Sequence, residues 1–242
     1  MEKIVNKLLV ITLSGAVFFG FVTFLFRNAR HDSVQQDNLI FDMCEYIDID
    51  LQRLPVSLIP YDESRIRIEY KNDLPLDFEL GDNRLSITES KKIVVSLFAG
   101  RDSEFGLTLY LPEQIYREIS VYTGTGNVNV GRVDSSKMTI GTETGDIYCG
   151  NAVSLMNLST TSGYISVDFD YVVSETEILS RNGDVLLKLP EGASAAVDFE
   201  TDEGQCLTDL NLGNPYGNSL YSFNGGKNRI HAIVQKGTLT IG

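Results

Sequence analysis

Apolar and polar residues alternate along most of the chain that follows residue 38. The segments Tyr46–Leu51, Arg65–Tyr70 and Leu107–Leu111 show this period of two most clearly. Successive side chains of a strand point to opposite faces, so the pattern predicts strands with one buried and one solvated face. Residues 39–119 are therefore expected to form antiparallel strands that lead into the rest of the domain, with one of them at residues 93–98.

A short phrase recurs through residues 120–242. A Ser or Thr at the end of a strand is followed by polar residues, a glycine, one further polar residue and usually Val or Ile. The glycines of the six copies are Gly126, Gly145, Gly163, Gly183, Gly204 and Gly237. The first four gaps between them are 19, 18, 20 and 21 residues, and the last is 33. Glycine accepts positive φ without strain, so these residues are expected at tight corners.

Each interval of about 20 residues has room for two short strands and two turns. Such a unit cannot bury its own apolar face, so neighbouring units must stack around a shared core. The near-constant spacing predicts an all-β fold of stacked strand repeats, a β-solenoid resembling a β-helix. Hairpins of a β-sandwich are the alternative. The long last gap contains the loop-forming residues 208–229, with one strand expected at 220–223.

The beginning of the chain follows a different pattern. Residues 8–26 are 19 consecutive residues without a charge. As a helix they would span roughly 28 Å, about the thickness of a bilayer core. We interpret residues 1–30 as a single transmembrane anchor with its flanks, and residues 31–38 as a linker. A cleaved signal peptide is the alternative, although the stretch is long for one and ends without a small-residue cleavage site.

Charge narrows the choice of partners. The chain carries a formal net charge of −13, although residues 1–30 carry +3. The remainder, at −16, argues against nucleic acid, which requires a basic surface. Basic residues flank residues 8–26 on both sides, so their balance does not orient the anchor. A short amino-terminal tail before a large domain favours an extracellular domain.

Catalytic motifs are absent from the sequence, and no cofactor is expected. There is no Gly-x-Ser-x-Gly, His-Glu-x-x-His or phosphate-binding loop. The two histidines, His31 and His231, are expected in the linker and in a strand. The three cysteines are Cys44, Cys149 and Cys206, and we expect them to be buried and unpaired.

Carboxylates provide the one candidate site. Asp168 and Asp170 are two residues apart on a predicted strand, as are Asp198 and Glu200, so each pair shares a face. Stacked in parallel, they could form a ladder that binds Ca²⁺ or supplies an acid and a base to a polysaccharide. The alternative is that they belong to the solvated surface of an acidic protein.

The order of these motifs resembles the putative-adhesin family of bacterial β-strand-repeat proteins, in particular its membrane-anchored, LiaG-like members. The shared features are the anchor, the strands Tyr46–Leu51 and Leu107–Leu111, the Gly-Asp turns at Gly145 and Gly183, and the closing segment Gly237–Ile241. The Asp is missing at Gly163-Tyr164 and Gly204-Gln205, which weakens the case for a repeated Asp site.

The resemblance implies a β-repeat domain on a bacterial cell surface. Together with the predicted anchor and the missing catalytic motifs, it favours a non-enzymatic, membrane-tethered module that acts as an adhesin or as an envelope-associated binding or stress-response accessory protein. Its partner would be an envelope protein or a cell-wall polymer. An envelope polysaccharide hydrolase or lyase that uses the surface carboxylates is one alternative, and a structural spacer that binds no ligand is another.

Overall fold

The computed structural model describes residues 36–71, 76–90, 106–152, 155–172, 175–208 and 217–242. These residues form strands and turns, and none of them forms a helix. No helix in this part of the chain is long and apolar enough to cross a membrane. The anchor predicted at residues 8–26 and the strand predicted at 93–98 lie outside the described residues.

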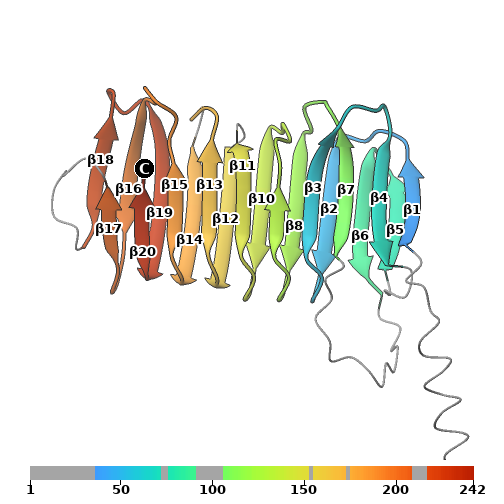
Figure 1. The fold of residues 1–242 in the computed structure, drawn as a ribbon, viewed down its shortest axis with the longest axis horizontal. Coiled ribbons are helices and arrows are strands. Elements are labelled where there is room, and N and C mark those ends of the chain that lie inside the picture. The colour runs from blue at the N-terminus through green and yellow to red at the C-terminus, as the bar shows by residue number, and fades with distance from the viewer. Residues whose placement is uncertain (1–35, 72–75, 91–105, 153–154, 173–174, 209–216) are drawn as a thin grey trace, which may run out of the picture. The chain divides into compact units, whose positions relative to one another are not determined.

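The strands form two ten-stranded sheets (Figure 1). Sheet A has the order β1 (Gln36–Phe41), β4 (Ile66–Lys71), β7 (Leu107–Pro112), β3 (Val56–Tyr61), β9 (Val128–Val130), β11 (Ile147–Ala152), β13 (Ile165–Phe169), β15 (Val185–Lys188), β20 (Thr238–Ile241) and β17 (Gln205–Thr208). Sheet B has the order β18 (Ser219–Phe223), β16 (Ala195–Glu200), β19 (Asn228–Lys236), β14 (Thr176–Asn182), β12 (Leu155–Ser162), β10 (Lys137–Thr142), β8 (Glu118–Thr123), β2 (Tyr46–Leu51), β6 (Arg84–Glu89) and β5 (Leu76–Gly81).

The repeats wind between the two sheets. From β8 to β15 the chain alternates between a strand of sheet B and a strand of sheet A, and each such pair is one coil. Neighbouring coils pair in parallel and in register, so Ile140 lies beside Leu158 and Leu158 beside Ile178. The prediction of an all-β fold of stacked strand repeats is confirmed.

Alternation of residue type explains the core. On β12, Met156 and Leu158 are buried while Leu155 and Asn157 face outwards; on β13, Ile165 and Val167 are buried. Because every coil is in register with the next, the inward side chains form continuous apolar rows between the sheets. Cys44, Cys149 and Cys206 are buried in this core as free thiols.

The amino-terminal strands differ from the expected antiparallel arrangement. β2 and β3 pair in parallel with both of their neighbours, and only β5–β6 and β4–β7 are antiparallel among the pairs given for this region. The alternating pattern predicted these strands correctly but is the same for either direction, so it could not predict how they pair.

Chain order and stacking order differ at both ends of the stack. Coil β2–β3 lies between β6–β7 and β8–β9, and coil β19–β20 lies between β14–β15 and β16–β17. The 33-residue gap before Gly237 therefore contains the edge strand β18, which pairs antiparallel with β16, and the return of the chain into the stack.

Candidate functional site

The corner between sheets B and A contains the recurring phrase, and its hydroxyl groups point inwards. Thr123, Thr142, Thr160 and Ser180 are buried. Thr142 Oγ1 donates to the carbonyl of Gly145 at 2.7 Å, and it lies 3.0 Å from Thr160 Oγ1, within hydrogen-bond distance. Ser180 Oγ donates to the carbonyl of Gly183 at 2.9 Å. A buried polar group is costly unless it is bonded, so the hydroxyl three residues before each of these glycines stabilises the turn.

The glycines stack directly on one another. A Cβ at Gly145 would lie 2.0 Å from the carbonyl oxygen of Gly126, and one at Gly163 would lie 2.3 Å from that of Gly145. The same approach links Gly183 to Gly163, Gly237 to Gly183 and Gly204 to Gly237. These stacked glycines form a column that follows the order of the coils in the stack.

The expectation of positive φ is wrong for most of these glycines. Only Gly183, at 156°, and Gly237, at 141°, have it, while Gly126, Gly145, Gly163 and Gly204 do not. The repeated phrase requires glycine mainly because the corner of the neighbouring coil leaves no room for a side chain.

The side chain of the residue after the glycine also links neighbouring coils. Asp146 Oδ1 accepts the backbone N–H of Tyr164 at 2.8 Å, and Asp184 Oδ1 accepts that of Thr238 at 2.8 Å. Asn127 Oδ1 accepts the N–H of Asp146 at 2.9 Å. Each side chain satisfies a backbone donor of the next coil, so the Gly-Asp turns have a structural explanation that needs no metal.

The carboxylates predicted to form one ladder lie on different sheets. Asp168 is on β13 of sheet A and Asp170 follows it, whereas Asp198 and Glu200 are on β16 of sheet B. Asp168 lies 3.8 Å from Lys188 Nζ, and Asp170 lies 3.1 Å from Arg132 Nη1. Because the two pairs lie on different sheets, a single ladder through all four residues is excluded. The spacing of residues in the sequence could not specify which sheet each strand joins.

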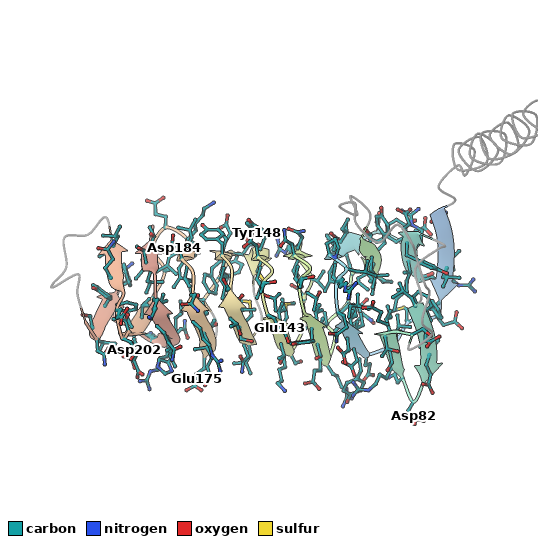
Figure 2. The ribbon with its side chains drawn as sticks, turned by 90° about the horizontal axis from the view of Figure 1, so that it is seen from below. Asp82, Glu143, Tyr148, Glu175, Asp184 and Asp202 are labelled. Carbon is teal, nitrogen blue, oxygen red and sulfur yellow. The ribbon has the colours of Figure 1, made fainter. Side chains whose placement is uncertain are left out.

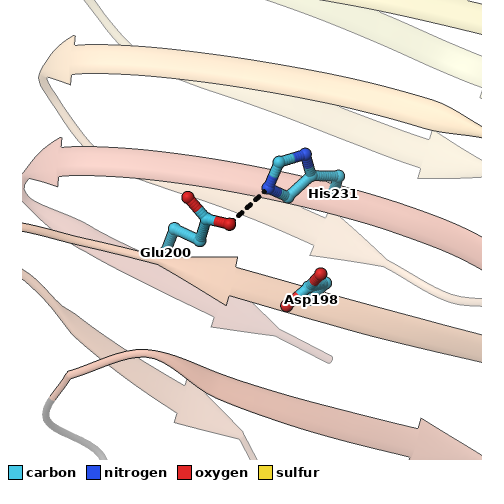
Figure 3. A group of neighbouring side chains, drawn as sticks. All are labelled: Asp198, Glu200 and His231. Atoms are coloured by element: carbon cyan, nitrogen blue, oxygen red, sulfur yellow. Dashed lines mark ion pairs between the residues drawn. The ribbon is translucent and has the colours of Figure 1, made fainter.

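Asp198 and Glu200 instead meet His231 of the adjacent strand β19 (Figure 3). The potential ligand atoms of the three side chains lie within 4.8 Å of one another. His231 Nε2 lies 3.1 Å from Glu200 Oε1, and Arg229 Nη2 lies 2.5 Å from Asp198 Oδ2. Both carboxylates thus already have a basic neighbour. Sequence reasoning placed His231 on a strand but missed this contact, because β19 comes next to β16 only through the insertion of the last coil.

Two adjoining hollows lie where sheet A reaches the opposite corner of the stack. The first is a cavity of about 460 Å³ lined by Pro60, Leu111, Pro112, Glu113, Gln114, Ile115, Arg132, Val133 and Asp134. The second is a trough of about 280 Å³ lined by Ser57, Leu58, Ile59, Pro60, Asn129, Val130, Gly131, Tyr148 and Gly150. Pro60 lines both, and none of the four predicted carboxylates lines either.

The family described as Toastrack DUF4097 matches residues 44–155 and 116–242 of this sequence. The chain belongs to the Toastrack DUF4097 family. Its two overlapping matches cover both the amino-terminal coils and the glycine-turn repeats. The resemblance to a family of bacterial β-strand-repeat proteins is confirmed. No curated protein matches the sequence.

The chain is also similar to solved structures at low sequence identity. One is described as a putative cell adhesion protein from Clostridium sporogenes; the match is 15% identical, has a TM-score of 0.50, and covers 86% of this chain and 98% of that one. Another is described as a putative adhesin from Bacteroides fragilis; it is 13% identical, has a TM-score of 0.45, and the match covers 86% of this chain and 97% of that one.

Proposed function

We propose that this Toastrack protein is a membrane-tethered, non-enzymatic binding module on the cell surface. Residues 8–26 would anchor it, and residues 39–242 would face outwards. Its partner would be an envelope protein or a cell-wall polymer. The uncharged length of residues 8–26 supports the anchor, and the strongly acidic remainder supports a partner other than nucleic acid.

The location of the hollows is the observation on which a binding role rests. Both open on the surface of the stack, and their lining includes none of the carboxylates that an acid/base mechanism would use. Asp168, Asp170, Asp198 and Glu200 lie within ion-pairing distance of Lys188, Arg132, Arg229 and His231, respectively. Acidic side chains labelled in Figure 2, such as Asp82, Glu175 and Asp184, are exposed and lie at separate places along the stack. The fold shared with a protein described as a putative cell adhesion protein agrees with this role.

The experiment that tests the proposal measures the topology of the protein in cells. A carboxy-terminal tag is exposed to protease on intact cells, and membranes are fractionated in parallel. We expect the tag to be cleaved from outside while the protein remains in the membrane pellet. Protection in intact cells that is lost on lysis would place the domain in the cytoplasm and refute a surface function.

A further inference from the structure

The larger hollow arises from the break in coil order. The chain leaves β7, skips coil β2–β3 and enters sheet B at β8, so its connection passes over the end of β3 (Figure 1). The next connection, from β9 to β10, joins neighbouring positions in the stack. The two connections meet at sheet B, where the N–H of Tyr116 donates to the carbonyl of Asp134 at 2.9 Å. At sheet A the two connections are two strand positions apart. The space left between them is the larger hollow, which we call the wedge.

The end of β3 keeps this wedge open. β9 pairs with β3 only as far as Leu58, and Gly131 makes the last backbone bond to it at 2.9 Å. Two residues further on is Pro60, which has no N–H to offer a neighbouring strand. The hollow is therefore a consequence of topology and sequence at a defined place in the stack.

The charges that line the wedge favour a cationic ligand. Arg132 is already paired with Asp170 at 3.1 Å, whereas Glu113 is exposed and has no ion pair among the described residues. Asp134 Oδ1 is shielded from solvent and has no hydrogen-bond partner in this part of the chain. A shielded carboxylate oxygen without a donor is costly. Asp134 lines the cavity, so its carboxylate is a candidate acceptor for a donor that binds there.

The trough extends the wedge across the outer face of sheet A. Gly150 lies within β11, and its φ is not positive. A Cβ there would meet only the carbonyl of Val130, at an ordinary 3.8 Å. Packing therefore does not require glycine at this position, although glycine weakens a strand. Ile59 and Tyr148 line the trough together with Gly150, and 38% and 39% of their surfaces are exposed.

We propose that the wedge and trough together bind an extended peptide segment with a basic side chain flanked by apolar residues. The basic group would lie by Glu113 and Asp134, and the apolar residues would contact Ile115, Pro60 and Tyr148. From β7 to β11 there are three strand spacings, roughly 14 Å, which an extended chain covers in about four to five residues. Charge complementarity favours a basic peptide over a neutral glycan. The inference rests on the proposed function and names the partner class as protein.

The test measures peptide binding to the purified full chain by fluorescence anisotropy. The probes are four labelled pools of acetylated pentapeptides, with Lys, Arg, Glu or Leu fixed at the centre and Val, Ile, Leu, Pro or Ser at the other positions. A tetramer of N-acetylglucosamine is the glycan probe. We expect the Lys and Arg pools to bind at least about tenfold more tightly than the Glu pool, as loss of a charged hydrogen bond implies.

Two variants locate the site, and each has a matched control. Asp134→Asn should weaken the Lys pool about tenfold, whereas Glu143→Gln, which removes one negative charge from an exposed turn, should not. Gly150→Leu fills the trough and should weaken all bound pools. Gly81→Leu, also at a glycine with open space and no positive φ, is its control. Melting curves of all four variants establish that they are folded.

Equal binding of the Lys and Glu pools, or no effect of either site variant, would overturn the inference. Glycan binding that Gly150→Leu abolishes, with no peptide bound, would overturn it in favour of a wall polymer and leave the proposed surface function standing. A cytoplasmic tag in the cell experiment would remove the surface function independently of any peptide result.

Discussion

The stacked corner glycines make a quantitative prediction, with Gly145→Ala as the perturbation. The added Cβ would lie 2.0 Å from the carbonyl oxygen of Gly126 and 2.6 Å from its carbon, where real Cβ atoms essentially never come closer than 3.0 Å. The two coils must therefore separate by about 1 Å or more at this corner. The methyl group has nowhere else to go, because the close neighbour is backbone.

The hydrogen bonds across this corner determine the cost. The N–H of Val128 donates to the carbonyl of Asp146 at 2.8 Å, and the N–H of Asp146 donates to Asn127 Oδ1 at 2.9 Å. Lengthening both by about 1 Å breaks them, at about 0.5–1.5 kcal/mol each. Overpacking adds about 1–3 kcal/mol. We expect Gly145→Ala to lower the free energy of unfolding by about 2–6 kcal/mol.

The assay is urea denaturation of the purified protein, followed by circular dichroism. Gly150→Ala is the control, because it adds the same methyl group to the same coil without a close contact. Its effect should stay within about 1 kcal/mol and can be stabilising. If Gly145→Ala and Gly150→Ala unfold at the same urea concentration, the corner tolerates a side chain and the reasoning from close approach is wrong.

Three further changes test other parts of the stack. Thr142→Val removes the hydroxyl contacts with Gly145 and Thr160 and should lower the free energy of unfolding in urea by about 1–2 kcal/mol. Its control, Thr139→Val, changes an outward-facing residue and should lower it by less than about 0.5 kcal/mol. Equal losses would contradict the role of the buried hydroxyls. Burial raises the pKa of the Cys149 thiol to about 12, so its contribution to stability is complete below pH 9 and lost as the pH rises towards 12. Between pH 8 and pH 10.5, the free energy of unfolding should therefore fall by about 2 kcal/mol more in the unmutated protein than in Cys149→Ala. Equal falls in the two proteins would show that the thiol ionises freely in the folded state. Ending the chain after Lys236 removes β20, which lies between β15 and β17, and limited proteolysis should then cut within residues 195–208; continued protection there would mean that β17 does not depend on β20.

Sequence reasoning recovered the strands and the corners but not the site. The period of two in Tyr46–Leu51 and the spacing of Gly126, Gly145, Gly163 and Gly183 are local properties of the chain, so they could be read directly. The hollows at Pro60 depend on which coil the β7–β8 connection passes over. The only local signal there is the pair Gly131 and Gly150, and a glycine in a strand is ambiguous without its neighbours.

The sequence by itself determined that the fold is all-β and favoured a stack of repeats over a β-sandwich, because the side chains alternate and the glycine corners recur at a near-constant spacing. The tertiary structure alone decided the order of the coils. The coils offer the same kind of parallel backbone pairing and similar apolar rows, so the backbone pattern of β14 does not by itself distinguish β19, its neighbour in the structure, from β16, the next sheet B strand in the chain. The insertion of β2–β3 and β19–β20 is selected by packing over the whole stack. That choice brings His231 beside Glu200 and opens the wedge at Pro60.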